Sequence, residues 1–200
     1  LFICFMNKKR SKVMIQKLNT LFDGLHTFII LWATQGFSAL GSSMTSYALV
    51  IWAYQQEGSA LASSLLTVCS YAPYVLLSIF AGALSDRWNK KLTMLVCDSF
   101  AALCTLSVLA LLAAGRLELW HLYVVNALSG LGNTLQQPAS DVAVSLLTPR
   151  GQYQKAAGMR AFSNSLVTIL APIFATALLS ALGIYAVIAF DLLTFTTAFL

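Results

Sequence analysis

The sequence predicts an all-α membrane protein, and three observations support that prediction. Of the 200 residues, 58% are hydrophobic and only 10% are charged, with a mean hydropathy of +0.78. Soluble domains carry roughly 25% charged residues, because charge covers their surface. The apolar residues also gather in runs of about 20 residues, the length at which a helix crosses a bilayer core. No run shows the two-residue alternation of membrane-spanning strands.

Six predicted helices follow one another along the chain, separated by short connections. Their expected ranges are 28–54, 60–84, 92–114, 119–147, 161–182 and 184–200. Residues 1–27 form a basic segment ahead of the first helix. The sixth helix is cut off at the end of the sequence, and Leu1 to Phe5 precede a methionine, Met6. We therefore expect part of a longer protein, whose carboxy-terminal part is missing.

Basic residues indicate the orientation of this bundle. Every Lys and Arg except Arg116 falls in the amino-terminal segment, in the second connection or in the fourth. Positive charge concentrates on the cytoplasmic side of membrane proteins. We expect a multi-pass protein of the cell (plasma) membrane with a cytoplasmic amino terminus. The net charge of +5 then reflects topology, and no nucleic-acid partner is predicted.

The second connection carries the most specific motif of the chain. Residues 82–91 read GALSDRWNKK, so an acid and three bases lie between two helix ends. Gly82 and Asn89 can supply the backbone freedom that a short turn needs. The stretch resembles the loop signature of the major facilitator superfamily, G-x-L-A-D-R-x-G-R-K, and lies between the helices where that family has it. The matching residues are Gly82, Leu84, Asp86, Arg87 and Lys91. The conservative departures are Ser85, Asn89 and Lys90.

Further positions resemble the macrolide-efflux and siderophore-exporter branch of drug:proton antiporters. They are Gln35, Ser38, Gly41, Gly58-Ser59-Ala60, Asp98, Gln137-Pro138-Ala139, Ala171-Pro172 and Asp191. The resemblance implies the amino-terminal six-helix half of a twelve-helix secondary active transporter. Such a transporter exports drugs or other amphipathic small molecules by alternating access coupled to protons, without a cofactor. Many of these antiporters carry an arginine in the fourth helix. Asn126 and Ser129 stand there in this chain, so that role is not transferred.

Polar residues recur at helical spacing in the first, fourth and fifth predicted helices, which places them on one face of each. Polar side chains that face lipid are costly, so these faces line a cavity or hold helices together by hydrogen bonds. In the family that the chain resembles, the first and fourth helices line the transport cavity, which favours the first alternative. The expected cavity residues are Gln35, Ser42, Asn126, Asn133, Gln137 and Asn164.

Acidic residues add two further hypotheses. Asp98 and Asp191 lie inside the third and sixth predicted helices, where either could carry a proton or have a structural role. The resemblance makes those two helices peripheral, which favours the structural role. It also implies that Asp86, Lys90 and Asp141 form a charge relay at a cytoplasmic gate. The rest of that gating loop is Gly82, Arg87 and Lys91.

Motifs for other classes of protein are missing from the sequence. It contains no G-x-S-G nucleophile, no H-x-x-E-H metal motif and no Walker loop, which intramembrane proteases, metalloenzymes and ATP-driven pumps require. We therefore predict no enzyme activity, no catalytic residue, no metal and no cofactor. The expected partners are the lipid bilayer, a small-molecule substrate, protons and the missing six-helix half. The alternative is a half-sized or non-functional six-helix fragment that acts only by assembly with another transporter half.

Overall fold

The computed structural model describes the backbone of residues 26–148 and 151–199, and side chains within residues 28–82, 88–148 and 151–197. Within these ranges all regular secondary structure is helical. The elements are α2 (His26–Glu57), α3 (Ala60–Arg87), α4 (Lys90–Ala113), α5 (Leu119–Leu147), α6 (Tyr153–Leu182) and α7 (Ile184–Phe199).

Several helix boundaries differ from the sequence-based expectation, and two of the differences concern candidate functional residues. α6 begins at Tyr153 rather than at residue 161, so Lys155 and Arg160 both lie inside the helix. α3 ends at Arg87 rather than at residue 84, so Gly82 lies more than one helical turn before the connection. The expectation that Gly82 serves as a turn residue is therefore wrong. Asn89 instead ends the connection: its side-chain oxygen accepts hydrogen bonds from the backbone N–H groups of Lys91 and Leu92, at 3.1 and 3.4 Å. This caps the start of α4.

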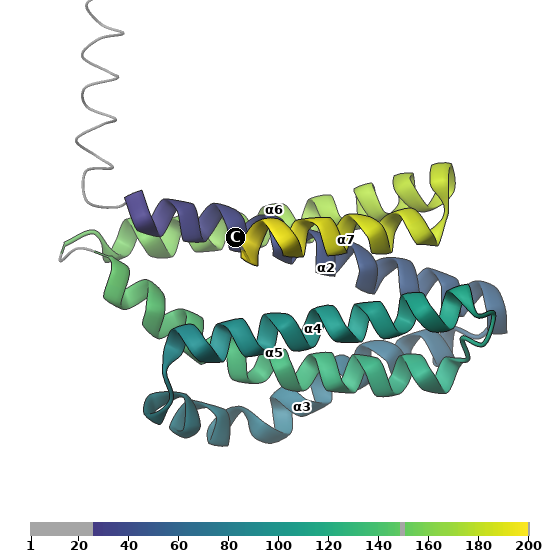
Figure 1. The fold of residues 1–200 in the computed structure, drawn as a ribbon, viewed down its shortest axis with the longest axis horizontal. Helices are drawn as coiled ribbons and strands as arrows, with labels where there is room; N and C mark the ends of the chain where they lie inside the picture. Colours follow the sequence, from purple (N-terminus) through teal and green to yellow (C-terminus); the bar gives the residue numbers. More distant parts are fainter. Residues whose placement is uncertain (1–25, 149–150, 200) are drawn as a thin grey trace, which may run out of the picture.

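The six helices form two layers of three (Figure 1). One layer contains α2, α6 and α7, and the other contains α3, α4 and α5. Consecutive helices run in opposite directions, so α2 and α4 run in the same direction. Contacts of α2 with α3, and of α4 with α7, join the layers.

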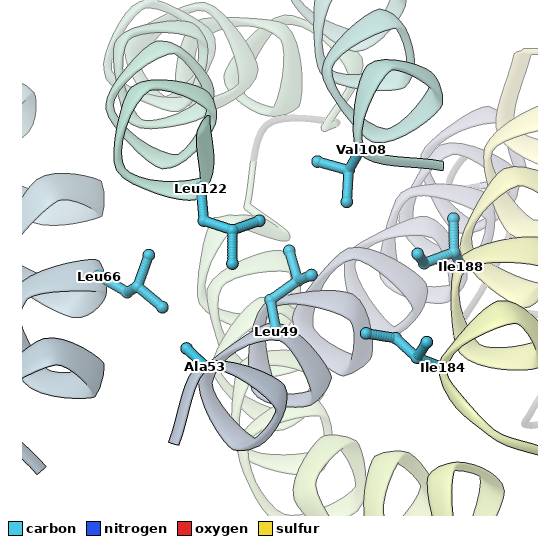
Figure 2. Close-up of a cluster of buried hydrophobic side chains, with 7 residues drawn as sticks. All are labelled: Leu49, Ala53, Leu66, Val108, Leu122, Ile184 and Ile188. Carbon is cyan, nitrogen blue, oxygen red and sulfur yellow. The ribbon is translucent and has the colours of Figure 1, made fainter. Parts of the chain in front are cut away.

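An apolar cluster fixes the two layers to each other near one end of the bundle. Figure 2 shows side chains from every described helix except α6 converging there: Leu49, Ala53, Leu66, Val108, Leu122, Ile184 and Ile188. Glycines bring other helix pairs together. A Cβ on Gly130 would lie 2.2 Å from the backbone oxygen of Ser70, and a Cβ on Gly41 would lie 2.1 Å from Oγ1 of Thr194. Small residues allow this close helix approach in membrane bundles.

Three helices in the described part of the chain are long and apolar enough to cross a membrane. The candidate spans are residues 60–82 in α3, 90–113 in α4 and 153–182 in α6. The apolar part of α7, residues 184–197, is shorter. α2 and α5 have 32 and 29 residues, which is sufficient length, but polar side chains interrupt them. One polar helix therefore lies in each layer.

Candidate functional site

A small polar cavity lies between α2, α4 and α7. Its volume is about 30 Å³, and Asp98 of α4 and Asp191 of α7 both line it. Ser38 and Ser42 of α2 and Thr105 of α4 supply hydroxyl groups to the same lining. The structure thus brings together the two acids that the sequence placed in separate helices.

Asp98 is held by two amide side chains. Nε2 of Gln136, on α5, donates to Oδ1 of Asp98 at 2.6 Å. Nε2 of Gln35, on α2, donates to Oδ2 at 3.5 Å. Both oxygens of this carboxyl group therefore face N–H donors that carry no net charge.

Asp191 is held by hydroxyl groups and is more deeply buried, with 4% of its surface exposed. Ser42 Oγ donates to Oδ1 at 3.0 Å, and Thr105 Oγ1 donates to Oδ2 at 3.3 Å. Thr45 Oγ1 lies close enough to interact with the same carboxyl group, but this buried oxygen forms no regular hydrogen bond. The Gly41 contact allows α7 to approach α2 closely enough for these bonds.

The spacing of these residues explains how the site forms. Gln35 and Ser42 are seven residues apart on α2, and Asp98 and Thr105 are seven residues apart on α4. Seven residues make about two helical turns, so each pair lies on one face, with a rise of about 10 Å. Because α2 and α4 run in the same direction, Gln35 meets Asp98 at one level. Asp191 bridges Ser42 and Thr105 at the next level.

A second polar site lies between α5 and α6, near the end of the bundle where α6 begins. Arg160 Nη1 donates to Oδ1 of Asp141 in an ion pair whose two side chains are 29% and 53% exposed. Both residues line an open hollow of about 360 Å³, together with Tyr153 and Asn164. Pro138 lies inside α5, and a proline bends a helix by removing a hydrogen bond. Beyond it, α5 turns toward α6 (Figure 1).

Of the expected gate residues whose side chains are described, Asp141 lines this second site. Asp141 pairs with Arg160, a partner that the sequence did not suggest. Lys90 Nζ donates to the backbone oxygen of Trp88 at 3.1 Å, and Lys91 is exposed. The side chains of Asp86 and Arg87 lie outside the described residues. The relay between Asp86, Lys90 and Asp141 stays a prediction.

The six expected cavity residues fall into three groups. Gln35 and Ser42 hold the two interior acids. Asn126 joins α5 to α3, because its Oδ1 accepts a hydrogen bond from Ser70 Oγ at 2.8 Å. The side chains of the remaining three residues are exposed: Asn133, Gln137 and Asn164.

Sequence reasoning missed two residues that hold the acids, Gln136 and Thr105. Gln137 fits the polar face of α5. Its neighbour Gln136 points in a different direction, as adjacent residues of a helix do, so Gln136 was not assigned to that face. The seven-residue spacing from Asp98 could have identified Thr105, since it places both on one helix face.

Residues 31–200 match the sequence profile of the Major Facilitator Superfamily. Macrolide efflux protein A of Streptococcus pyogenes is 29% identical over 167 residues, which cover 83% of this chain and 41% of that protein. The uncharacterized MFS-type transporter YfiS of Bacillus subtilis is 28% identical over 168 residues, covering 84% of this chain and 39% of the relative. The chain therefore spans about two fifths of the length of these relatives. With the profile match covering most of its residues, the chain belongs to the Major Facilitator Superfamily of membrane transporters.

Proposed function

We propose that the protein works in secondary active transport and exports amphipathic small molecules by alternating access, driven by protons. The observation that carries this proposal is the cavity with Asp98 and Asp191. Ionisable residues inside a membrane bundle are costly and mark ion or substrate pathways. The similarity to a macrolide efflux protein supports efflux as the direction and a bulky, amphipathic molecule as the substrate.

In this proposal the substrate path runs along the polar faces of α2, α5 and α6. Asn133, Gln137 and Asn164 are exposed at that face, and Ser42 connects it to the interior acids. A second six-helix half covers the face in the active transporter, either from the same chain or by assembly with another half. Single cysteines at Asn133 and Gln137 should react with a water-soluble thiol reagent. Cysteines at Ile79 and Val75, exposed apolar positions of α3, should not, and equal labelling of both sets would contradict the path.

The proposed gate lies at the end of the bundle where α3 and α5 end, which is cytoplasmic if the amino terminus is inside the cell. Gly82, Asp86 and Arg87 in the last turns of α3 and Lys90 and Lys91 in the first turn of α4 flank the short connection, and Asp141 is the facing acid. Partly buried charge pairs tolerate the loss of one partner poorly. Asp86→Asn should therefore abolish transport without reducing expression, and Asp141→Asn should impair it less. Export by Asp86→Asn at the wild-type rate would leave the loop without a gating role.

The transport activity itself can be tested in cells that produce the protein from its complete coding sequence. These cells should accumulate less of a fluorescent amphipathic dye than cells with an empty vector. A protonophore that collapses the proton gradient should remove the difference, because it removes the driving force. Equal dye accumulation in both cell lines, with the protein present in the membrane fraction, would rule out efflux of this dye class.

A further inference from the structure

We propose that the cavity between α2, α4 and α7 is a proton-binding site with two unlike acids. Asp191 takes up and releases the proton, whereas Asp98 keeps its negative charge throughout the cycle. The inference rests on the proposed proton-driven transport and deepens it, because it assigns the two roles to individual carboxyl groups.

The two acids have different kinds of hydrogen-bond partner, and this difference is the basis for assigning them different roles. Asp98 faces N–H donors at both oxygens, from Gln136 and Gln35. With their N–H groups turned toward Asp98, the two Gln side chains donate and present no acceptor, an orientation that suits a carboxylate. Asp191 faces the hydroxyl groups of Ser42 and Thr105. A hydroxyl group rotates and can donate or accept. The surroundings of Asp191 therefore suit both of its protonation states.

The size of the cavity limits which ligands can enter it. A water molecule needs roughly 10–15 Å³ of such volume, so about 30 Å³ holds two or three water molecules. A chain of two water molecules, joined to each other and to a polar group at each end by hydrogen bonds of about 2.8 Å, spans about 8 Å. That length is comparable to the rise between the Gln35 level and the Ser42 level. A drug-sized molecule does not fit, because its pocket requires roughly 300 Å³ or more.

An independent observation points to a ligand next to Asp191. Thr45 is only 6% exposed, and its hydroxyl group lies close enough to the carboxyl group to interact with it, but without a hydrogen bond of regular geometry. A buried hydroxyl group without a partner is costly. A water molecule that delivers the proton would supply this partner. Ser42 is exposed as well as bonded to Asp191, which gives such water a way in from the face of α2.

The elements packed against α7 favour a proton over a metal cation. From α4 the titratable groups near the site are Asp98 and the buried thiols Cys97 and Cys104. α2 and α6 contribute no acid or base to the described lining. A metal cation needs several oxygen ligands, but the groups that face the carboxyl group of Asp98 are N–H donors, which cannot coordinate a cation. Proton uptake forms an O–H bond at Asp191 and breaks one in a hydronium ion, so the charge of the pair changes from −2 to −1.

Infrared spectroscopy of the full-length protein, carrying 13C-labelled aspartate carboxyl groups, tests this division of roles. Wild type should show a carboxylic C=O band that disappears as the pH is raised. Asp191→Asn should lose the band, Asp98→Asn should keep it, and the exposed control Asp141→Asn should match wild type. A band that survives in Asp191→Asn, or that disappears only in Asp98→Asn, would overturn the assignment.

A second pair of variants covers the case in which Asp191→Asn does not fold. Ser42→Ala removes a hydrogen bond to Asp191 and should move the pH midpoint of the band. Ser46→Ala, whose hydroxyl group bonds only within its own helix, should leave the midpoint unchanged. Equal midpoints in both variants would place the titrating acid elsewhere.

Two further comparisons separate this inference from its rivals. Replacing choline by Na⁺ at constant ionic strength should not move the midpoint, and a movement would assign the site to a metal cation. The infrared titration needs no transported substrate. If the band behaves as expected in a protein that exports no dye, the proposed function fails and the proton site stands. If the protein exports dye but the band does not belong to Asp191, the proton site fails alone.

Discussion

The two acidic sites of this molecule are stabilised in opposite ways. At the end of the bundle, Asp141 is more than half exposed and pairs with a fixed cation, Arg160. In the interior, Asp98 and Asp191 line one cavity and have no ion-pair partner among the described residues. Their hydrogen-bond partners are neutral amide and hydroxyl groups.

This difference teaches what each site can do. The ion pair between Asp141 and Arg160 is exposed to solvent, so its two side chains can separate and re-form their contact, which suits a gate. A buried carboxylate without a cation is costly, and a nearby second carboxylate adds repulsion. Taking up a proton relieves both costs, so the interior pair suits energy coupling.

The largest expected effect on stability comes from the amide that holds Asp98. Gln136→Leu removes a 2.6 Å hydrogen bond to a charged group, which should lower the free energy of unfolding by about 1.5–3 kcal/mol. The neighbouring Gln137→Leu is the matched control. Its side chain is exposed, so the change should stay within about 0.5 kcal/mol. Denaturant titration in detergent, followed by circular dichroism, measures both. Equal losses would mean that the Asp98 contact adds nothing to the fold.

Close packing beside Asp191 gives the second prediction. In Gly41→Ala the new Cβ would lie 2.1 Å from Thr194 Oγ1, and overpacking of this kind costs about 1–3 kcal/mol. Gly158, in α6 near the exposed ion pair, has nothing within 4 Å of its added Cβ. Gly158→Ala should therefore be neutral, or more stable by about 0.5–1 kcal/mol because alanine favours a helix. Thermal unfolding in detergent compares them. A Gly41→Ala protein as stable as wild type would show that α2 and α7 are not closely packed.

The smallest effect is expected at the exposed pair. Removing the charge in Asp141→Asn should cost about 0.2–1 kcal/mol, the usual range for exposed ion pairs. High salt should reduce this difference further, because it screens exposed charges. A double-mutant cycle with Arg160→Gln, at low and high salt, isolates the pair. A coupling energy well above this range that does not respond to salt would mean that the pair is buried in the assembled transporter, which would weaken the contrast with the interior site.

The sequence predicted the helices and their polar faces, but not the contacts between helices. The spacing of apolar and polar residues predicted six helices and the polar faces of α2 and α5, because helical periodicity is a local property. Periodicity assigns a residue to a face of its helix but does not identify the helix opposite. The sequence thus placed Gln35 and Ser42 on the polar face of α2, but it could not show that they bond to Asp98 and Asp191. For the same reason, nothing in the sequence indicated that Arg160 of α6 pairs with Asp141 of α5.

The central claim is that the interior acids, and not the exposed ion pair, couple protons to transport. The most direct measurement is dye uptake into proteoliposomes that contain the full-length protein, driven by an imposed pH gradient alone. Wild type and Asp141→Asn should both respond to the gradient, with the variant somewhat slower. Asp191→Asn should still exchange dye at equal pH but gain nothing from the gradient, because it has no proton to carry. Gradient-driven uptake by Asp191→Asn at the wild-type rate would contradict the account.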